Sequence, residues 1–340
     1  VASDNIFNIL KQDAVCGTMD YLMEISNKVG RFGVCIIDES SMLTYEIFYR
    51  FIKKFPFPIK FVLVGDMNQL EPIGRGHLLG ELIKSKRVPI VKLIQNHRIL
   101  KSIEIKKKAK EDGIEIDQKD QNNDSIILNN ANFLVDGMRD KTKIMTFEIG
   151  EGFSVVPNGD INVLIMLIES FHSAGIEEKD IVILYPYNDL LPELNKIPQK
   201  IYRPNNKFRL FNGQNFMVGD RVSYLHTRNK FKLFNGTEGI IDDITDKGCY
   251  IIMKKTKFLL FWSRQQDGPD LNQDDQLYMN EISQSFAATV GKYQGLSRKF
   301  VIPFKPDRRD KNGNKTTISN IKSIYTEITR AEVGVLIVGD

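Results

Sequence analysis

Two short apolar segments that each end in an acid constrain the fold of this chain most strongly. They are VCIID at residues 34–38 and FVLVGD at residues 61–66. The segment between them places its apolar side chains on one helical face: Ile47, Phe48, Phe51 and Ile52. Lys53 and Lys54 close the last turn of this predicted helix. A strand, a helix and a second strand within about 30 residues predict a βαβ unit with parallel strands.

The acids follow the two predicted strands directly, at their carboxyl ends. Continuous apolar strands are typical of a parallel sheet covered on both faces, and functional side chains lie at the carboxyl ends of its strands. Four residues occupy that position here: Asp38, Glu39, Gly65 and Asp66. One acid can hold Mg²⁺, and a second beside it can orient or deprotonate a water. The structural alternative is an acidic pair that opens a helix, where carboxylates favour the helix dipole.

A second α/β region follows in the later part of the chain. Residues 161–175 predict a helix ended by Gly175. Residues 180–188, 299–304 and 333–340 are apolar runs typical of buried strands. A second parallel sheet is therefore expected. The polar stretch at 106–125 fits either a charged helix followed by a loose loop or a mobile surface insertion.

Between about 209 and 282 the pattern changes to short β-rich runs without helices. Asn212-Gly213 and Asn235-Gly236 are hairpin signals, and residues 246–248 predict a further turn. Closely spaced strands of this kind predict a small antiparallel barrel. Because predicted buried strands flank it on both sides, the barrel is expected to be an insertion.

Composition narrows the class of protein. The chain has 340 residues, which is enough for two domains, and a net charge of +4, which permits a nucleic-acid partner without requiring one. Its three cysteines fit no metal-binding pattern and indicate reduced, intracellular thiols. No signal peptide and no apolar run of about 18 residues is found, so neither secretion nor a membrane partner is expected.

Further candidate residues lie in four other segments. Gln69, in LVGDMNQLEPIG, can contact a phosphate or the attacking water, or it is simply a polar loop residue. Arg98, in QNHRIL, suits a terminal phosphate, or it forms a surface ion pair. AATVGKYQG offers small polar side chains and amides that can bind phosphates: Thr289, Lys292, Gln294 and Gly295. YTEITRA places Arg330 on a helix before the last predicted strand.

Taken in order, these segments resemble the motifs of the RecD-like helicases of superfamily 1. IIDESSM resembles motif II, LVGDMNQLEPIG motif III, NHR motif IV, AATVGKYQG motif V and YTEITRA motif VI. The resemblance implies an α/β fold of two RecA-like parallel-sheet domains, the second with a small inserted β-barrel of the Src-homology type. The implied boundaries are 1–97 for the first domain, 98–218 with 283–340 for the second, and 219–282 for the barrel.

The resemblance also implies ATP-dependent translocation along single-stranded DNA, in the 5′-to-3′ direction, with ATP and Mg²⁺ bound between the two domains. Asp38 and Glu39 would hold Mg²⁺, and Glu39 would also act as the catalytic base. Gln69 would sense the γ-phosphate, Arg98 and Arg330 would act as arginine fingers, and Gly295 would lie at the nucleotide. Thr289, Lys292 and Gln294 would contact DNA. A monomer is expected, and replication or recombination proteins are compatible partners.

The chain departs from the family pattern at two places. Gly291 stands where motif V usually has a histidine. The phosphate-binding pattern G-x-x-x-x-G-K-[S/T] is absent from the sequence. The opening residues resemble the segment that follows this loop in the family, so we expect the loop to lie upstream of Val1 and this chain to be inactive alone. The alternatives are a non-catalytic module that binds single-stranded DNA and a related superfamily 1 RNA helicase.

Overall fold

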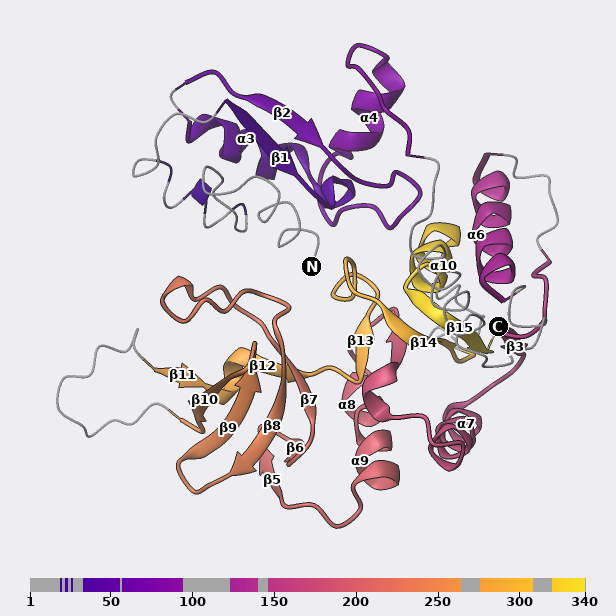
Figure 1. Ribbon diagram of the computed structural model, residues 1–340, viewed down its shortest axis with the longest axis vertical. Coiled ribbons are helices and arrows are strands. Elements are labelled where there is room, and N and C mark those ends of the chain that lie inside the picture. Colours follow the sequence, from indigo (N-terminus) through magenta and orange to yellow (C-terminus); the bar gives the residue numbers. More distant parts are fainter. Residues whose placement is uncertain are drawn as a thin grey trace, which may run out of the picture. The chain divides into compact units, whose positions relative to one another are not determined.

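The computed structural model describes most of the chain in two compact units (Figure 1). It describes residues 33–55, 57–93, 123–139, 146–263, 276–307 and 320–339, with residues 19, 22, 23 and 26. Unit 1 comprises Val1–Val91 and His226–Phe234, and unit 2 comprises Lys92–Leu225 and Asn235–Asp340. Among the described residues, no helix is both long and apolar enough to cross a membrane.

Unit 1 contains the predicted βαβ arrangement. Its elements are β1 (Val34–Ile37), the 3-10 turn η1 (Ser40–Met42), α3 (Tyr45–Lys53), β2 (Lys60–Leu63) and α4 (Leu78–Ser85). β1 and β2 pair in parallel, with Ile37 opposite Leu63. Thr44 caps α3 by accepting a hydrogen bond from the Ile47 amide at 3.2 Å, so the helix begins directly after η1. The predicted parallel unit is confirmed.

Only one face of the β1–β2 pair is covered by the described helices. Cys35 and Phe61 point to that face, and Phe51 of α3 is completely buried against it. The alternate side chains Val34 and Ile36 are 52% and 46% exposed. The expectation that both faces of these strands are buried is therefore wrong for unit 1. Ile52, expected on the buried face of α3, is also exposed, because the apolar stripe of the helix is narrower than its apolar run.

Unit 2 is built on a five-stranded parallel sheet in the order β13–β4–β14–β15–β3. The strands are β3 (Phe153–Val156), β4 (Ile181–Tyr185), β13 (Ala287–Thr289), β14 (Arg298–Lys305) and β15 (Ala331–Gly339). The helices and the 3-10 turn are α6 (Asn123–Arg139), α7 (Ile161–Ser173), η3 (Glu178–Asp180), α8 (Leu191–Leu194), α9 (Lys196–Tyr202) and α10 (Ile321–Ile328). β4 is buried along its whole length, as a central strand of a covered sheet should be.

The predicted helix and strands of this region are confirmed. Asp160 caps α7 by accepting hydrogen bonds from the amides of Asn162 and Val163. Gly175 follows the helix with φ of +76°, a left-handed conformation that ends helices and that glycine adopts without strain. The polar stretch at 106–125 lies mostly outside the described residues.

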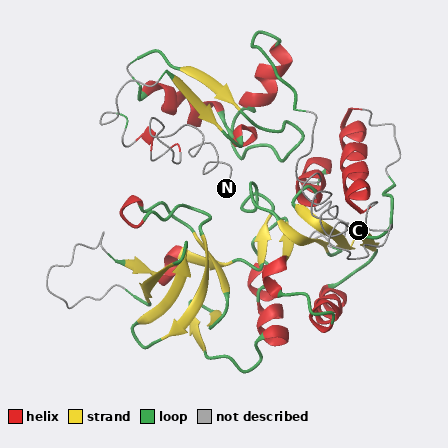
Figure 2. Cartoon of the chain, viewed as in Figure 1, coloured by secondary structure: helices red, strands yellow, loops and turns green. Residues whose placement is uncertain are grey.

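A mostly antiparallel six-stranded sheet is inserted between β4 and β13, in the order β11–β10–β9–β8–β7–β12. The strands are β7 (Arg221–Tyr224), β8 (Glu238–Ile244), β9 (Gly248–Met253), β10 (Thr256–Phe261), β11 (Leu277–Tyr278) and β12 (Ile282–Gln284). Figure 2 shows this region as strands and loops with short helical turns; the turns are η4 (Asn229–Phe231) and η6 (Met279–Glu281). A separate hairpin, β5 (Phe208–Phe211) with β6 (Gln214–Met217), precedes it.

The order of these strands requires strong curvature. β11 and β12 occupy opposite edges of the sheet but are joined by η6 alone. A flat sheet of this size would hold its edge strands about 24 Å apart, whereas four residues of chain span at most about 14 Å. The sheet is therefore rolled up so that its edges approach, which makes it a small barrel.

The predicted α/β fold class and the inserted antiparallel sheet are confirmed. Asn212 and Gly213 both have positive φ and join β5 to β6, as the hairpin signal predicts. Residues 245–247 turn the chain between β8 and β9. The Src-homology type of the barrel and the boundaries at 97/98, 218/219 and 282/283 stay predictions.

Candidate functional site

The carboxyl end of β1 carries the two acids on a strained turn. Asp38 is exposed, and its Oδ1 accepts a hydrogen bond from the Glu39 amide at 2.9 Å. Glu39 has φ of +49° and ψ of +36°, a left-handed conformation that is unfavourable for a residue with a side chain. The Ser40 amide and hydroxyl both donate to the Val64 carbonyl, at 2.9 and 2.8 Å. These bonds fix the acidic turn against the end of β2.

Gly65 allows this close approach. A Cβ atom at this position would lie 2.9 Å from the Ser40 hydroxyl, the Ser41 amide nitrogen and the Leu79 side chain. Because one of these atoms belongs to the backbone, the acidic turn would have to move to admit a methyl group. Gly65 therefore sets the spacing between the two strand ends.

Gln69 lies in the turn that follows β2. The Asp66 side chain accepts from the Asn68 amide at 2.9 Å, and the Asp66 carbonyl accepts from the Gln69 amide at 3.2 Å. The Gln69 side chain is only 8% exposed, yet its Oε1 atom has no hydrogen-bond partner among the described residues. Buried amides are normally satisfied, so this oxygen is suited to accept a hydrogen bond from a water or another donor.

Asp38 and Glu39 fit Mg²⁺ that arrives with phosphate groups. Among the described residues, no group of three or more acidic, histidine or cysteine side chains could form a metal site by itself. Mg²⁺ usually takes one or two protein carboxylates and completes its shell with phosphate oxygens and waters. Asp38 and Glu39 could supply these carboxylates.

Arg330 lies in unit 2, between α10 and β15. It is 4% exposed, and its Nε donates to the Thr326 carbonyl at 3.2 Å. Its backbone carbonyl accepts from the Arg298 amide at 3.0 Å. The side chain is thus held against the end of α10 and would have to rearrange to place its guanidinium on a phosphate. Arg98 lies outside the described residues.

Residues 289–295 form a turn anchored from inside the protein. The Tyr293 amide donates to the Thr289 carbonyl at 3.1 Å, and the Tyr293 ring is 2% exposed. Lys292 is exposed on the other side, and Gly295 has φ of +77°. A Cβ atom at Gly291 would meet no heavy atom within 4 Å, so a side chain could stand there without displacing its surroundings.

Strand register separates the two groups of candidates within unit 2. Thr289 pairs with Tyr185 of β4, and Tyr185 is level with Phe304 near the end of β14. Arg330 comes just before Ala331, which pairs with Arg298 at the start of β14. The six residues from Arg298 to Phe304 span about 20 Å along the strand. The sheet therefore places Thr289 at its carboxyl edge and Arg330 at its amino edge.

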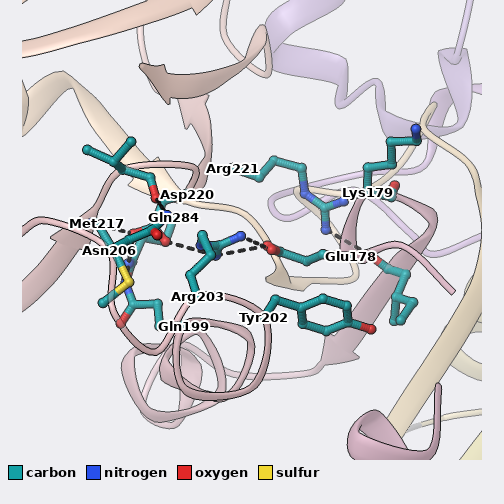
Figure 3. Close-up of polar contacts among 12 residues, drawn as sticks. Glu178, Lys179, Gln199, Tyr202, Arg203, Asn206, Met217, Asp220, Arg221 and Gln284 are labelled. Carbon is teal, nitrogen blue, oxygen red and sulfur yellow. Dashed lines mark hydrogen bonds and ion pairs between the residues drawn. The ribbon is translucent and has the colours of Figure 1, made fainter. Parts of the chain in front are cut away.

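A buried polar network that no sequence pattern indicates joins the barrel to the rest of unit 2 (Figure 3). Asp220 accepts hydrogen bonds from Arg203, Gln199, Gln284 and the Met217 amide, at 2.7 to 3.0 Å. Arg203 also pairs with Glu178. Burial raises the pKa of Asp220, and the hydrogen bond from Gln284 and the positive charge of Arg203 oppose that shift. The partners are up to 64 residues apart, so no local pattern signals them.

Comparison with known proteins gives a family match for the first part of the chain. Residues 1–123 match the sequence model of an AAA domain. This range contains Asp38, Glu39 and Gln69.

Several solved structures are similar over most of the chain at low identity. The Bacteroides Pif1 helicase in complex with ADP-AlF3 and ssDNA is 16% identical, with a TM-score of 0.41 over 96% of this chain and 75% of its own. The Pif1 helicase from Candida albicans is 15% identical, with a TM-score of 0.43 over 95% of this chain and 77% of its own.

Proposed function

We propose that this chain is the motor region of a RecD-like superfamily 1 DNA helicase that hydrolyses ATP and moves along single-stranded DNA in the 5′-to-3′ direction. The observation that carries the proposal is the arrangement at the ends of β1 and β2. Asp38 and Glu39 stand on a turn fixed to β2, and Gln69 in the following turn has a buried acceptor without a partner among the described residues. The match of residues 1–123 to an AAA domain supports a nucleotide site in the same part of the chain.

Each residue has a role that suits phosphoryl transfer, which depends on positioning and charge stabilisation. Asp38 and Glu39 would hold Mg²⁺, which neutralises charge on the phosphates when bound. Glu39 would accept the proton of the attacking water, and the free Oε1 of Gln69 would orient that water. Arg98 and Arg330 would stabilise charge on the transferred phosphoryl group, and Gly295 would lie near the nucleotide.

DNA contact is assigned to the exposed side of the turn at residues 289–295. Thr289, Lys292 and Gln294 offer a hydroxyl, an ammonium and an amide, which suit the phosphates and sugars of a strand rather than base edges. The buried Tyr293 ring keeps this turn in place from the inside. Binding through such contacts should be independent of sequence and weaken with salt.

Binding and hydrolysis are tested separately. Fluorescence anisotropy with a labelled oligo(dT) strand tests binding by this chain, with an RNA strand of the same length as the comparison. ATP hydrolysis and strand displacement are measured on the full-length protein. The proposal expects DNA binding, DNA-stimulated hydrolysis and displacement of DNA duplexes from a 5′ tail.

The absence of G-x-x-x-x-G-K-[S/T] from the sequence favours one second candidate, a module that binds single-stranded DNA without hydrolysis. DNA binding without hydrolysis by the full-length protein would select that candidate. Preference for RNA duplexes would select the RNA helicase, and a protein that binds neither nucleic acid would overturn all three readings.

A further inference from the structure

An ion pair in unit 2 joins the barrel to the strand that borders Arg330. Nη2 of Arg298, the first residue of β14, lies 2.5 Å from both carboxylate oxygens of Glu238, the first residue of β8. Their side chains are only 16% and 27% exposed. A charge-assisted bond in partly buried surroundings is screened less by water and salt than a surface pair is.

Arg298 also holds the turn that carries Arg330. Its backbone amide donates to the Arg330 carbonyl at 3.0 Å, so a displacement of the first residue of β14 reaches that turn directly. Ser297, the preceding residue, donates through its hydroxyl to Glu332 of β15. The amino ends of β14 and β15 are therefore connected on both sides of Arg330.

The same guanidinium faces the turn assigned to DNA. The Arg298 guanidinium lies 5.7 Å from the centre of the Tyr293 ring, which anchors residues 289–295. One side chain thus contacts the barrel, the DNA turn and, through its backbone, the Arg330 turn. No other residue is needed to connect these three parts.

Further hydrogen bonds, made by Arg221 and Asp220, hold the base of the barrel. Arg221 of β7 donates to the carbonyls of Lys179, Ile181 and Ser285, at 2.8 to 3.3 Å. The neighbouring Asp220 accepts hydrogen bonds from Met217, which ends β6 just before the barrel, and from Gln284, which ends β12, the last strand of the barrel (Figure 3). Loss of the Glu238–Arg298 pair should therefore leave the barrel folded and attached.

Hydrogen bonding around the pair is incomplete. Nε of Arg298 and the hydroxyl of Tyr293 are buried without a partner in the described part of the chain. A cluster with unused donors can exchange partners at low cost, unlike the network at Asp220, where the carboxylate receives four bonds.

We propose that Glu238 and Arg298 are positioning residues that transmit occupation of the DNA turn and the barrel to the backbone of Arg330. If the proposed function holds, the consequence is that DNA stimulates ATP hydrolysis through this pair, and this part of the inference rests on the proposed function. The geometric part, that the pair holds the Arg330 turn, stands independently of it.

Hydrogen exchange with mass spectrometry tests the geometric part on this chain without DNA. Glu238→Gln should increase exchange in peptides that cover 296–300 and 328–333, while β9 and β10 stay protected. The matched control is Asp180→Asn. Asp180 pairs at 2.9 Å with Lys299, which follows Arg298 on β14, so this variant also removes one negative charge from an ion pair of the same strand. Equal exchange in the two variants would overturn the proposal.

DNA-stimulated hydrolysis by the full-length protein tests the coupling. Glu238→Gln and Arg298→Gln should lower the ratio of DNA-stimulated to DNA-free kcat about 5-fold or more, with DNA affinity changed less than about 2-fold. Exchanging the charges, Glu238→Arg with Arg298→Glu, should restore part of that ratio. If the wild type is active and the variants show an unchanged ratio, only the coupling is overturned. If the wild type neither binds DNA nor hydrolyses ATP, the proposed function is overturned. In that case the hydrogen-exchange experiment still tests whether the pair holds the Arg330 turn.

Discussion

Replacing Lys305 by methionine should make the stability of unit 2 strongly dependent on pH. Lys305 ends β14 and pairs with Glu327 of α10 at 2.5 Å, and the two side chains are 3% and 0% exposed. Without Lys305, Glu327 would keep only the Ser323 hydroxyl at 3.2 Å, because its second oxygen already has no partner in the described structure. A buried carboxylate in that position would take up a proton rather than remain charged.

The magnitude follows from the cost of that proton. Burial already raises the pKa of Glu327 above its ordinary value of 4.5, and Lys305 opposes the shift. If the variant keeps Glu327 protonated at pH 7, the cost relative to an ordinary carboxyl is about 3 kcal/mol, from about 1.4 kcal/mol per pH unit. Because the folded state then binds the proton more tightly than the unfolded chain, this cost vanishes below pH 4.5 and grows as pH rises.

The assay is hydrogen exchange of peptides from β14, α10 and β15, which reports unit 2 without assuming that the whole chain unfolds in one step. Lys305→Met should lose up to about 3 kcal/mol of local stability at pH 7, because part of the shift is already present in the wild type, and less than about 1 kcal/mol at pH 5. Lys299→Met, at the more exposed pair with Asp180 near the other end of β14, should cost below about 1 kcal/mol at both pH values. Lys305→Met with Glu327→Leu should recover most of the loss. An equal loss at pH 5 and pH 7 would refute the reasoning.

Three further predictions concern the two candidate sites. Gly65→Ala should lower ATP hydrolysis by the full-length protein by about 10-fold or more, since the added methyl displaces the turn of Asp38 and Glu39; unchanged hydrolysis would contradict the assigned spacing. Gly291→His should leave thermal stability within about 0.5 kcal/mol, since the position is open, and should strengthen binding to oligo(dT); weaker binding would show that the turn does not face DNA. Lys292→Gln should reduce the slope of log Kd against log salt by about 1, and an unchanged slope would remove Lys292 from the DNA contacts.

Local patterns were sufficient to predict most elements of the fold. The apolar runs gave β1, β2, β4, β14 and β15, and Asn212-Gly213 gave the β5–β6 hairpin, because period and turn chemistry act within a few residues. Burial of both faces of β1 was predicted wrongly, since an apolar run shows what a strand can bury and not what covers it. The exposure of Ile52 has the same cause.

The candidate sites were predicted less completely than the fold. Asp38, Glu39 and Gln69 were found because they follow strands, where parallel sheets place functional groups. Glu238 and Arg298 were missed because they are 60 residues apart and meet only through the barrel insertion. The buried state of Arg330 and the strain at Glu39 are also properties of packing that no spacing reveals.

Measuring ATP hydrolysis by the Glu39→Gln variant tests most directly whether this protein is an ATP-hydrolysing helicase. ATP hydrolysis by the full-length protein is measured with and without oligo(dT), beside binding of a fluorescent ATP analogue, for wild type and Glu39→Gln. The account predicts DNA-stimulated hydrolysis in the wild type, a loss of about 100-fold or more in the variant, and retained nucleotide binding. Hydrolysis at the wild-type rate by Glu39→Gln would contradict it.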